Sequence, residues 1–333
     1  MARAPPIIDF APFYHGDSET RARLVEEIRS ACEGLGFFQL CNHGIPVDLQ
    51  DGILQQSQQL FRLPPEVKER YNRDNDRFNR GYEPLRSQNF EKRSKGDLKE
   101  GFFLGRDLPL DDPVVQAGHF GQGPNKYPAE VPDPALFRAT VDCYYDAALE
   151  LAVDIMAVIA EMVGLDQQTL ERLCHRPIAT LRLLHYPPQP PDAPELERGI
   201  GAHSDFGAIT ILLQDSTGGL QVWDRESSEW ADVQPIPGAV VVNTGNLMMR
   251  WSNDRYISNL HRVINRSGHE RYSVPFFFDG NADFVVECLP SCREAGQPAR
   301  HAPITVGAWM AGRYADTYEG DEGNPAKDLV GLD

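Results

Sequence analysis

The stretch Gly201-Ala-His-Ser-Asp-Phe-Gly-Ala-Ile-Thr-Ile-Leu-Leu-Gln214 joins a His-Ser-Asp segment to a run of aliphatic and β-branched residues. Such a run, introduced by glycine, is typical of a buried β-strand. In an extended chain the side chains at i and i+2 point to the same face. His203 and Asp205 are therefore expected to face one point, just before a core strand over 208–214.

Short β-rich runs occupy the chain around this stretch, from Arg176-Pro177 onward. We predict eight of them, separated by turn residues: 180–186, 208–214, 220–224, 229–233, 239–244, 257–264, 272–278 and 284–288. Eight short strands at this spacing favour a double-sheet jelly roll, also called a double-stranded β-helix. We therefore expect a mainly β core.

The N-terminal half has a different pattern, dominated by helical periodicity. Strands are predicted over 7–10 and 36–41, and a long helix over 136–164. The apolar spacing from Leu24 to Leu35 predicts another helix, which Asp17 or Ser18 can cap at its start and which Gly34 and Gly36 end. The segment 71–135 is rich in turn residues and is predicted to form long loops around one strand at 101–105. Helices first and strands later indicate an α+β protein whose β core is flanked by helices.

The predicted helix over 136–164 is apolar on most of its surface. Asp142, Asp146, Glu150 and Asp154 recur every four residues and form one acidic stripe. A helix of this kind is expected to lie deep against the core and to expose only the stripe.

We expect one catalytic unit over residues 1–333. Its expected parts are an N-terminal helix and strand region with substrate loops (1–135), a long core-packing helix region (136–176), a jelly-roll core (177–290) and a C-terminal extension (291–333).

The composition excludes several classes of protein. The 32 basic and 49 acidic side chains give a net charge of −17, which argues against nucleic-acid binding. None of the six cysteines forms a C-x-x-C pair, so reduced thiols are expected rather than a zinc site. No signal peptide or membrane-spanning stretch is visible, which predicts a cytoplasmic protein without a membrane partner. The oligomeric state is not indicated.

A third metal-ligand candidate is His261, which follows His203 by 58 positions (261 − 203). A jelly roll can bring its strand beside the first pair. Two histidines and one carboxylate on one face form the facial triad of non-haem Fe(II) oxygenases, which leaves open coordination positions. A bare H-x-D motif is also compatible with an ordinary buried His–Asp hydrogen bond.

Arg271-Tyr-Ser273 distinguishes between these interpretations. Arg271 and Ser273 share a face of the run 272–278, and an arginine fork with a hydroxyl suits a carboxylate. Pairing of Arg271 with an acidic side chain of the protein remains the alternative. Together with a metal triad, the pair predicts a small dicarboxylate held by iron at one end and by Arg271 at the other.

The sequence resembles the isopenicillin N synthase-like branch of the Fe(II)/2-oxoglutarate-dependent dioxygenases. The resemblance is carried, in the family's order, by Gly36-Phe-Phe-Gln-Leu-Cys-Asn-His-Gly-Ile-Pro46, Arg182-Leu-Leu-His-Tyr-Pro187, Gly201-Ala-His-Ser-Asp-Phe-Gly207, Gly218-Gly-Leu-Gln-Val222, Pro237-Gly-Ala-Val-Val-Val-Asn243, Arg250-Trp-Ser-Asn253, His261-Arg-Val263 and Arg271-Tyr-Ser273. These segments span nearly the whole chain.

The resemblance implies a secondary-metabolism oxidoreductase that uses Fe(II), 2-oxoglutarate and O2, with ascorbate as a candidate reductant. Hydroxylation, desaturation or ring rearrangement of a small substrate would then release succinate and CO2. The implied iron ligands are His203, Asp205 and His261.

The resemblance also implies a set of co-substrate residues. Arg271 and Ser273 would bind the distal carboxylate of 2-oxoglutarate, Tyr186 would hydrogen-bond the co-substrate, and Val263 would form an apolar wall. Many plant members have an asparagine where this chain has Leu184. That contact is therefore missing or replaced here.

We expect the substrate pocket to be apolar, with Phe103, Phe206 and Phe277 as candidates and His185 as a further pocket-facing residue. An aromatic pocket suits a hydrophobic or planar metabolite. Two alternatives remain at this stage. One is an oxidase of the same fold that uses O2 without 2-oxoglutarate, and the other is a jelly-roll binding protein whose metal site is silent.

Overall fold

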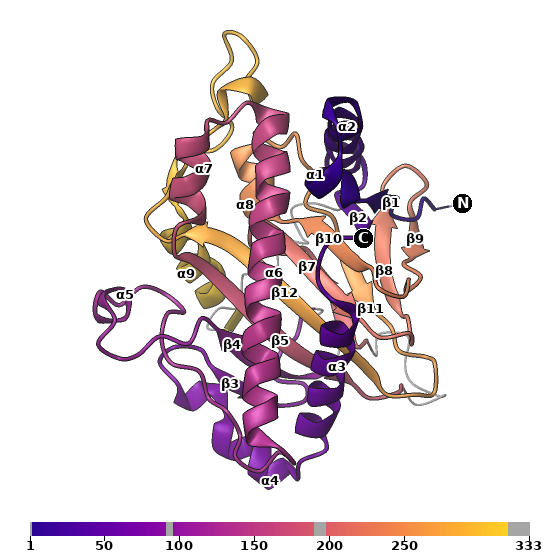
Figure 1. Cartoon of the computed structure of the whole chain (residues 1–333), viewed down its shortest axis with the longest axis vertical. Coiled ribbons are helices and arrows are strands. Elements are labelled where there is room, and N and C mark those ends of the chain that lie inside the picture. Colours follow the sequence, from indigo (N-terminus) through magenta and orange to yellow (C-terminus); the bar gives the residue numbers. More distant parts are fainter. Residues whose placement is uncertain (1, 91–95, 190–197, 319–333) are drawn as a thin grey trace.

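The computed structural model describes residues 2–90, 96–189 and 198–318, and arranges most of them in two β-sheets flanked by helices (Figure 1). The larger sheet has the strand order β1 (Ile7–Asp9), β2 (Phe37–Cys41), β10 (Val240–Thr244), β7 (Ile209–Gln214), β12 (Arg271–Asn281), β5 (Pro177–Tyr186), β4 (Glu100–Gly105) and β3 (Gly81–Glu83). The smaller sheet has the order β6 (Ile200–His203), β11 (His261–Val263), β8 (Leu220–Asp224) and β9 (Glu229–Asp232).

Nearly all neighbouring strands pair in the antiparallel sense; the exception among the named strands is β1 with β2. An apolar cluster with residues from both sheets includes Phe37, Leu184, Tyr186, Val222 and Val263. The predicted jelly-roll core with flanking helices is thus confirmed.

Helices cover the outer face of the larger sheet (Figure 1). Those that pack on its strands are α2 (Ser18–Gly34), α3 (Val47–Phe61), α6 (Pro134–Val163) and α7 (Gln167–Cys174). The described chain also contains α1 (Ala11–His15), α4 (Pro65–Lys68), α5 (Pro113–Gln116) and α8 (Asn246–Trp251), with 3-10 turns at Glu69–Tyr71, Arg73–Asn75 and Pro290–Cys292. Helix α9 (Val306–Tyr318) differs, because its Met310 and Tyr314 line a cavity beside the cavity-facing side chains of β12. Side chains of β12 alternate between the two faces, so Phe276 and Phe278 join the helix-side core while Phe277 faces the other way. Tyr145 of α6 packs edge-on against Phe276.

Helix α6 is the long predicted helix, and its ends follow from local chemistry. The Asp133 side chain accepts a hydrogen bond from the Leu136 backbone N–H at 3.0 Å, and Pro134 fits the first turn. Gly164 ends the helix in a left-handed conformation with φ of 70°. Asp146 and Glu150 are exposed and Asp142 and Asp154 are partly exposed, as predicted. The stripe is not the whole exposed surface, however, because the first turn is exposed as well, including Leu136.

Several element boundaries differ from the sequence prediction. The expected strand 257–264 pairs only over the three residues of β11, and 284–288 is reduced to β13 (Val285–Val286), which pairs with β14 (Ile304–Thr305) outside both sheets. Strand β6 was missed because it is short and contains a glycine. The segment 71–135 is also more ordered than predicted, since it contains β3 and α5 besides β4.

Residues 319–333 of the expected C-terminal extension lie outside the described residues. The described part of the extension contributes β14 and α9. Within the three described ranges, no helix is both long and apolar enough to cross a membrane.

Candidate active site

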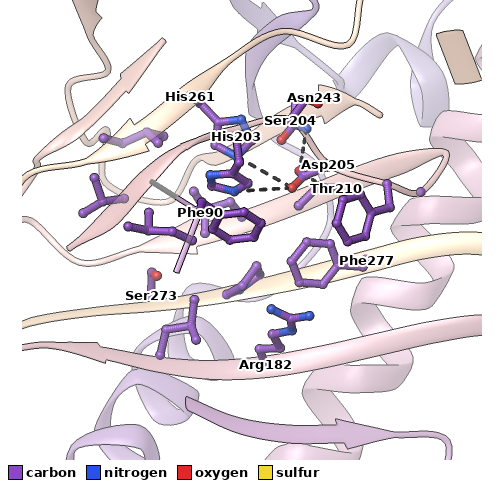
Figure 2. Close-up of a pocket in the computed structure, with 18 of the residues that line it drawn as sticks. Phe90, Arg182, His203, Ser204, Asp205, Thr210, Asn243, His261, Ser273 and Phe277 are labelled. Carbon is purple, nitrogen blue, oxygen red and sulfur yellow. Dashed lines mark hydrogen bonds and ion pairs between the residues drawn. The ribbon is translucent and has the colours of Figure 1, made fainter. Parts of the chain in front are cut away.

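Three potential metal ligands converge in the space between the two sheets. His203 ends β6, Asp205 follows it, and His261 begins β11, where it pairs directly with His203. The Oδ1 atom of Asp205 lies 3.8 Å from Nε2 of His203 and 3.7 Å from Nε2 of His261. One ligand atom from each residue lies within 4.8 Å of the others, and Figure 2 shows the three side chains turned towards one another.

Backbone carbonyls fix the orientation of both imidazoles. Nδ1 of His203 lies 2.8 Å from the carbonyl oxygen of Gly201, and Nδ1 of His261 lies 3.4 Å from that of Asn259. A hydrogen bond donated by Nδ1 leaves Nε2 as the free ligand atom. Burial, reinforced by the neighbouring His261, lowers the pKa of His203 to about 3, so this imidazole is neutral as a metal ligand requires.

Two further side chains fix the Asp205 carboxylate. Its Oδ2 accepts hydrogen bonds from Oγ1 of Thr210 at 2.6 Å and from Nδ2 of Asn243 at 2.8 Å. Burial alone would raise the pKa of Asp205, but the two imidazoles and these hydrogen bonds outweigh it and hold the pKa below its ordinary value. The carboxylate is therefore ionised, with Oδ1 directed at the histidines. Two imidazoles and one carboxylate in this arrangement fit Fe(II) with open positions.

A buried arginine lies further along the same space. Arg271 is fully buried and donates to the Gly218 carbonyl oxygen at 2.6 Å, to Oε1 of Gln214 at 3.2 Å and to Oγ of Ser273 at 3.4 Å. Its guanidinium also lies over the Tyr186 ring at 4.7 Å. No carboxylate of the described residues pairs with it. The alternative of an internal ion pair is thus wrong for this part of the chain, and a buried cation with neutral partners favours binding of an anion.

One cavity of about 960 Å³, including its open mouth, connects the triad to Arg271. Nine of the residues singled out from the sequence line it: Tyr186, His203, Asp205, Phe206, His261, Val263, Arg271, Ser273 and Phe277. Leu184 lines it as well, so the position of the family asparagine faces the cavity with an apolar side chain.

His185 does not line this cavity, which corrects the expectation that it faces the pocket. As the residue between Leu184 and Tyr186 on β5, it points to the opposite face. There Nδ1 of His185 lies 2.8 Å from Oε1 of Glu100, and its ring stacks against Phe61 and Tyr272. His185 is a packing residue of the outer face.

Phe103 is also absent from the cavity wall, contrary to expectation. It is fully buried and lies one layer further back, between the guanidinium groups of Arg73 at 4.4 Å and Arg182 at 4.1 Å. Arg182, which pairs with Phe103 across β5 and β4, occupies the wall instead. Phe103 thus supports a residue of the wall.

Sequence reasoning missed several residues of the wall. Phe90 stacks on the His203 ring with a centroid distance of 4.5 Å (Figure 2), and Phe37 packs edge-on against His261. Both rings shield the triad from water. Phe37 carries a signal, because it lies on the predicted strand 36–41, whereas Phe90 lies in a segment whose sequence indicates only a loop.

Asp279 is the other missed residue with chemical importance. It lines the cavity with 1% of its surface exposed, and its Oδ1 has no hydrogen-bond partner. Burial, with a contribution from the charge of Asp205, raises the pKa of Asp279 to about 8, although Arg182 acts in the opposite direction. The carboxyl group is therefore mostly protonated at neutral pH in the metal-free protein.

This shift predicts a pH-dependent effect of Asp279→Asn on stability. Above the unfolded-state pKa near 4 the unfolded chain releases the proton that the folded chain keeps until about pH 8, so wild-type stability falls as the pH rises through this window. Asparagine carries no titrating proton and therefore removes this dependence. In the wild type the dependence amounts to at most about 1.4 kcal/mol of unfolding free energy per pH unit. In thermal unfolding of metal-free protein, the gain in Tm from the substitution should grow between pH 5 and pH 8. A gain that is the same at both ends of this range would contradict the shifted pKa.

The fold and the site together define a non-haem iron oxygenase. Comparison with known proteins agrees. Residues 177–280 match the family model of the 2OG-Fe(II) oxygenase superfamily, and residues 5–130 match that of the non-haem dioxygenase in morphine synthesis N-terminal region. The chain belongs to the 2OG-Fe(II) oxygenase superfamily and is a 2-oxoglutarate-dependent dioxygenase, with Fe(II), 2-oxoglutarate and O2 as the requirements of its class.

Individual relatives match over almost the whole chain. The 2-oxoglutarate-Fe(II) type oxidoreductase hxnY of Emericella nidulans is 50% identical over 95% of this chain and 90% of its own length. Clavatol oxidase claD of Penicillium crustosum is 35% identical over 94% of this chain and 96% of its own. A full-length Neurospora crassa protein, crystallised in complex with alpha-KG and thymine, has a TM-score of 0.83 at 30% identity, covering 94% of this chain and 97% of that one.

Proposed function

We propose that this enzyme oxidises a small, planar and largely aromatic metabolite in the cytoplasm, with release of succinate and CO2. His203, Asp205 and His261 would hold the Fe(II). Arg271 and Ser273 would bind the distal carboxylate of 2-oxoglutarate. The observation that carries this proposal is that all five residues line one cavity, with the triad and the buried arginine facing the same space.

The geometry supports a separate role for each part of the site. Bound Fe(II) would supply O2 activation coupled to oxidative decarboxylation of 2-oxoglutarate and oxidation of a substrate C–H bond. Arg271 provides a fork for a carboxylate, and Ser273 adds a hydroxyl beside it. Tyr186 and Val263 line the cavity too, and Tyr186 lies against Arg271, so these two side chains would limit the orientation of the co-substrate. Phe37 and Phe90 keep water away from the triad.

The substrate class is inferred from the aromatic side chains around the remaining space. Phe90, Phe206 and Phe277 line the cavity on the side of the triad, and such walls suit a planar ring. The Neurospora crassa structural neighbour was crystallised with thymine, which is also a small planar ring. The net charge of −17 argues against a nucleic-acid substrate, and six free cysteines suit a reducing compartment.

Anaerobic titration of the Fe(II)-loaded protein with 2-oxoglutarate tests the proposed function. Chelation should produce a weak visible charge-transfer band that saturates at one 2-oxoglutarate per chain. Absence of the band would contradict the co-substrate assignment. Substrate oxidation that proceeds without added 2-oxoglutarate would support the oxidase alternative that Leu184 left open.

A further inference from the structure

Strand β12 contributes a row of alternate side chains to the cavity wall. Arg271, Ser273, Pro275, Phe277 and Asp279 all line the cavity, as the alternation of a strand requires. The row begins at the carboxylate-binding pair and ends at Asp279, eight residues or about 26 Å away along an extended strand. The two ends of the row therefore face different parts of the cavity.

The metal triad lies between these two ends. Phe277 pairs with Thr210 on β7, and Thr210 donates the hydrogen bond that fixes Asp205. Phe277 is thus level with the triad, and Asp279 lies beyond it, on the side away from Arg271. A substrate that approaches the iron from the side opposite the distal carboxylate of 2-oxoglutarate meets Phe277 and Asp279.

The local backbone directs Asp279 into this space. The pairing of β12 with β5 shifts register between Phe278 and Gly280, and Gly280 has φ of 104°, a conformation that favours glycine. Opposite Asp279, Gly207 has no side chain, and a Cβ atom there would lie 2.0 Å from Oδ1 of Asp279. A bulge and a glycine thus make room for one carboxyl group, which is 1% exposed.

Oδ1 of Asp279 is buried and has no hydrogen-bond partner among the described residues. Burying an unpartnered polar atom is unfavourable, so its presence in a native protein calls for an explanation such as a catalytic role, a bound water or an ion. Arg182 lines the cavity near this carboxyl group, donates to the Tyr314 hydroxyl at 3.2 Å and lies 4.9 Å from the centre of the Phe277 ring (Figure 2). Its guanidinium is planar and presents its N–H donors in a fixed geometry.

We propose that Asp279 is the substrate-specificity residue: it accepts a hydrogen bond from an N–H or O–H group on a planar ring, while Arg182 donates to a neighbouring carbonyl of the same ring and Phe277 stacks on its face. The substrate class is then a cyclic amide, or a hydroxylated ring that presents a donor next to an acceptor. This inference rests on the proposed function, because it places the substrate beside the iron.

Matched pairs of ring compounds that differ in one donor test this assignment. The probes are thymine with 1,3-dimethylthymine, 2-pyridone with N-methyl-2-pyridone, and 2-quinolone with N-methyl-2-quinolone. Binding is measured by calorimetry and by the shift of the charge-transfer band in anaerobic protein loaded with Fe(II) and 2-oxoglutarate. We expect at least one N–H ring to bind, and to bind about 10-fold or more tightly than its methylated partner, because methylation leaves the buried acceptor unpaired.

Substitutions at Asp279 assign the preference to this residue. In Asp279→Leu, the preference for the N–H ring over its methylated partner should fall below about threefold. Asp279→Asn keeps a carbonyl acceptor and should retain the preference. Asp224→Asn, at an equally buried position on β8 outside the cavity, should also retain it. If Asp279→Leu does not fold, Asp279→Ala replaces it.

Three results would overturn the inference: equal binding of the methylated rings by wild type, a preference that survives both Asp279→Leu and Asp279→Ala, or binding of none of the N–H rings. Each is separate from failure of the proposed function, which would appear as absence of the charge-transfer band on addition of 2-oxoglutarate alone.

Discussion

Asp205→Ala is expected to lower the affinity for Fe(II) at least about 100-fold and to reduce 2-oxoglutarate turnover to background, because loss of an inner ligand exceeds the 10- to 100-fold cost of losing an outer-shell partner. The substitution removes the only negative ligand of the triad and leaves two imidazoles whose Nε2 atoms lay 3.8 and 3.7 Å from its Oδ1. Bound iron, measured by metal analysis after desalting, and succinate release report the two effects.

The control for Asp205→Ala is Asp224→Ala. Asp224 is a buried carboxylate outside the cavity that hydrogen-bonds to the Arg3 backbone N–H and to Ser227. Its removal should affect stability and leave the iron content near that of wild type. An unchanged iron content in Asp205→Ala, with a native circular dichroism spectrum, would show that the triad is not the metal site.

Arg271→Met is expected to weaken 2-oxoglutarate binding about 100-fold or more, since a buried bidentate contact to a carboxylate is lost. The variant should fold well without ligand. Arg271 has no carboxylate partner among the described residues, so its removal breaks no internal ion pair and relieves the cost of burying the cation. The stabilisation that saturating 2-oxoglutarate gives to the wild type should disappear.

Measurement of KM for 2-oxoglutarate and of the ligand-induced change in Tm separates binding from folding in Arg271→Met. Arg271→Lys serves as its partner variant, because it keeps the charge but loses the planar fork, and should give an intermediate KM. If the KM of Arg271→Met for 2-oxoglutarate stays within about threefold of wild type, the co-substrate binds elsewhere in the cavity. A threefold change corresponds to only about 0.6 kcal/mol, which is too small for the loss of a charge-assisted hydrogen bond.

Much of the fold was predictable because its signals are local. The apolar runs and turn residues after Pro177 predicted most of the core strands, and the period of four in the acidic stripe predicted which side of α6 faces solvent. The boundaries of β11 and β13 were not predictable. They depend on where a partner strand ends, which is a property of the tertiary structure.

Some residues of the site were predictable from the sequence and others were not. The alternation rule placed His203 with Asp205 and Arg271 with Ser273 on common faces, and the jelly roll brought His261 opposite His203. The same rule applied to β5 would have excluded His185, which lies between two cavity-facing residues. Asp279 obeys the same rule, since it follows Phe277 by two residues on β12, but the predicted strand ended at 278 and therefore did not include it.

The row of side chains on β12 has a consequence for how this enzyme can be modified. The side chains proposed to bind the co-substrate and those proposed to bind the substrate lie at opposite ends of one strand, with Pro275 between them. Substrate preference can then be redesigned by exchanging side chains at the Asp279 end while the Arg271 end is left intact. A library of variants confined to Phe277, Asp279 and Arg182 would change substrate preference while the residues proposed to bind iron and 2-oxoglutarate stay unchanged.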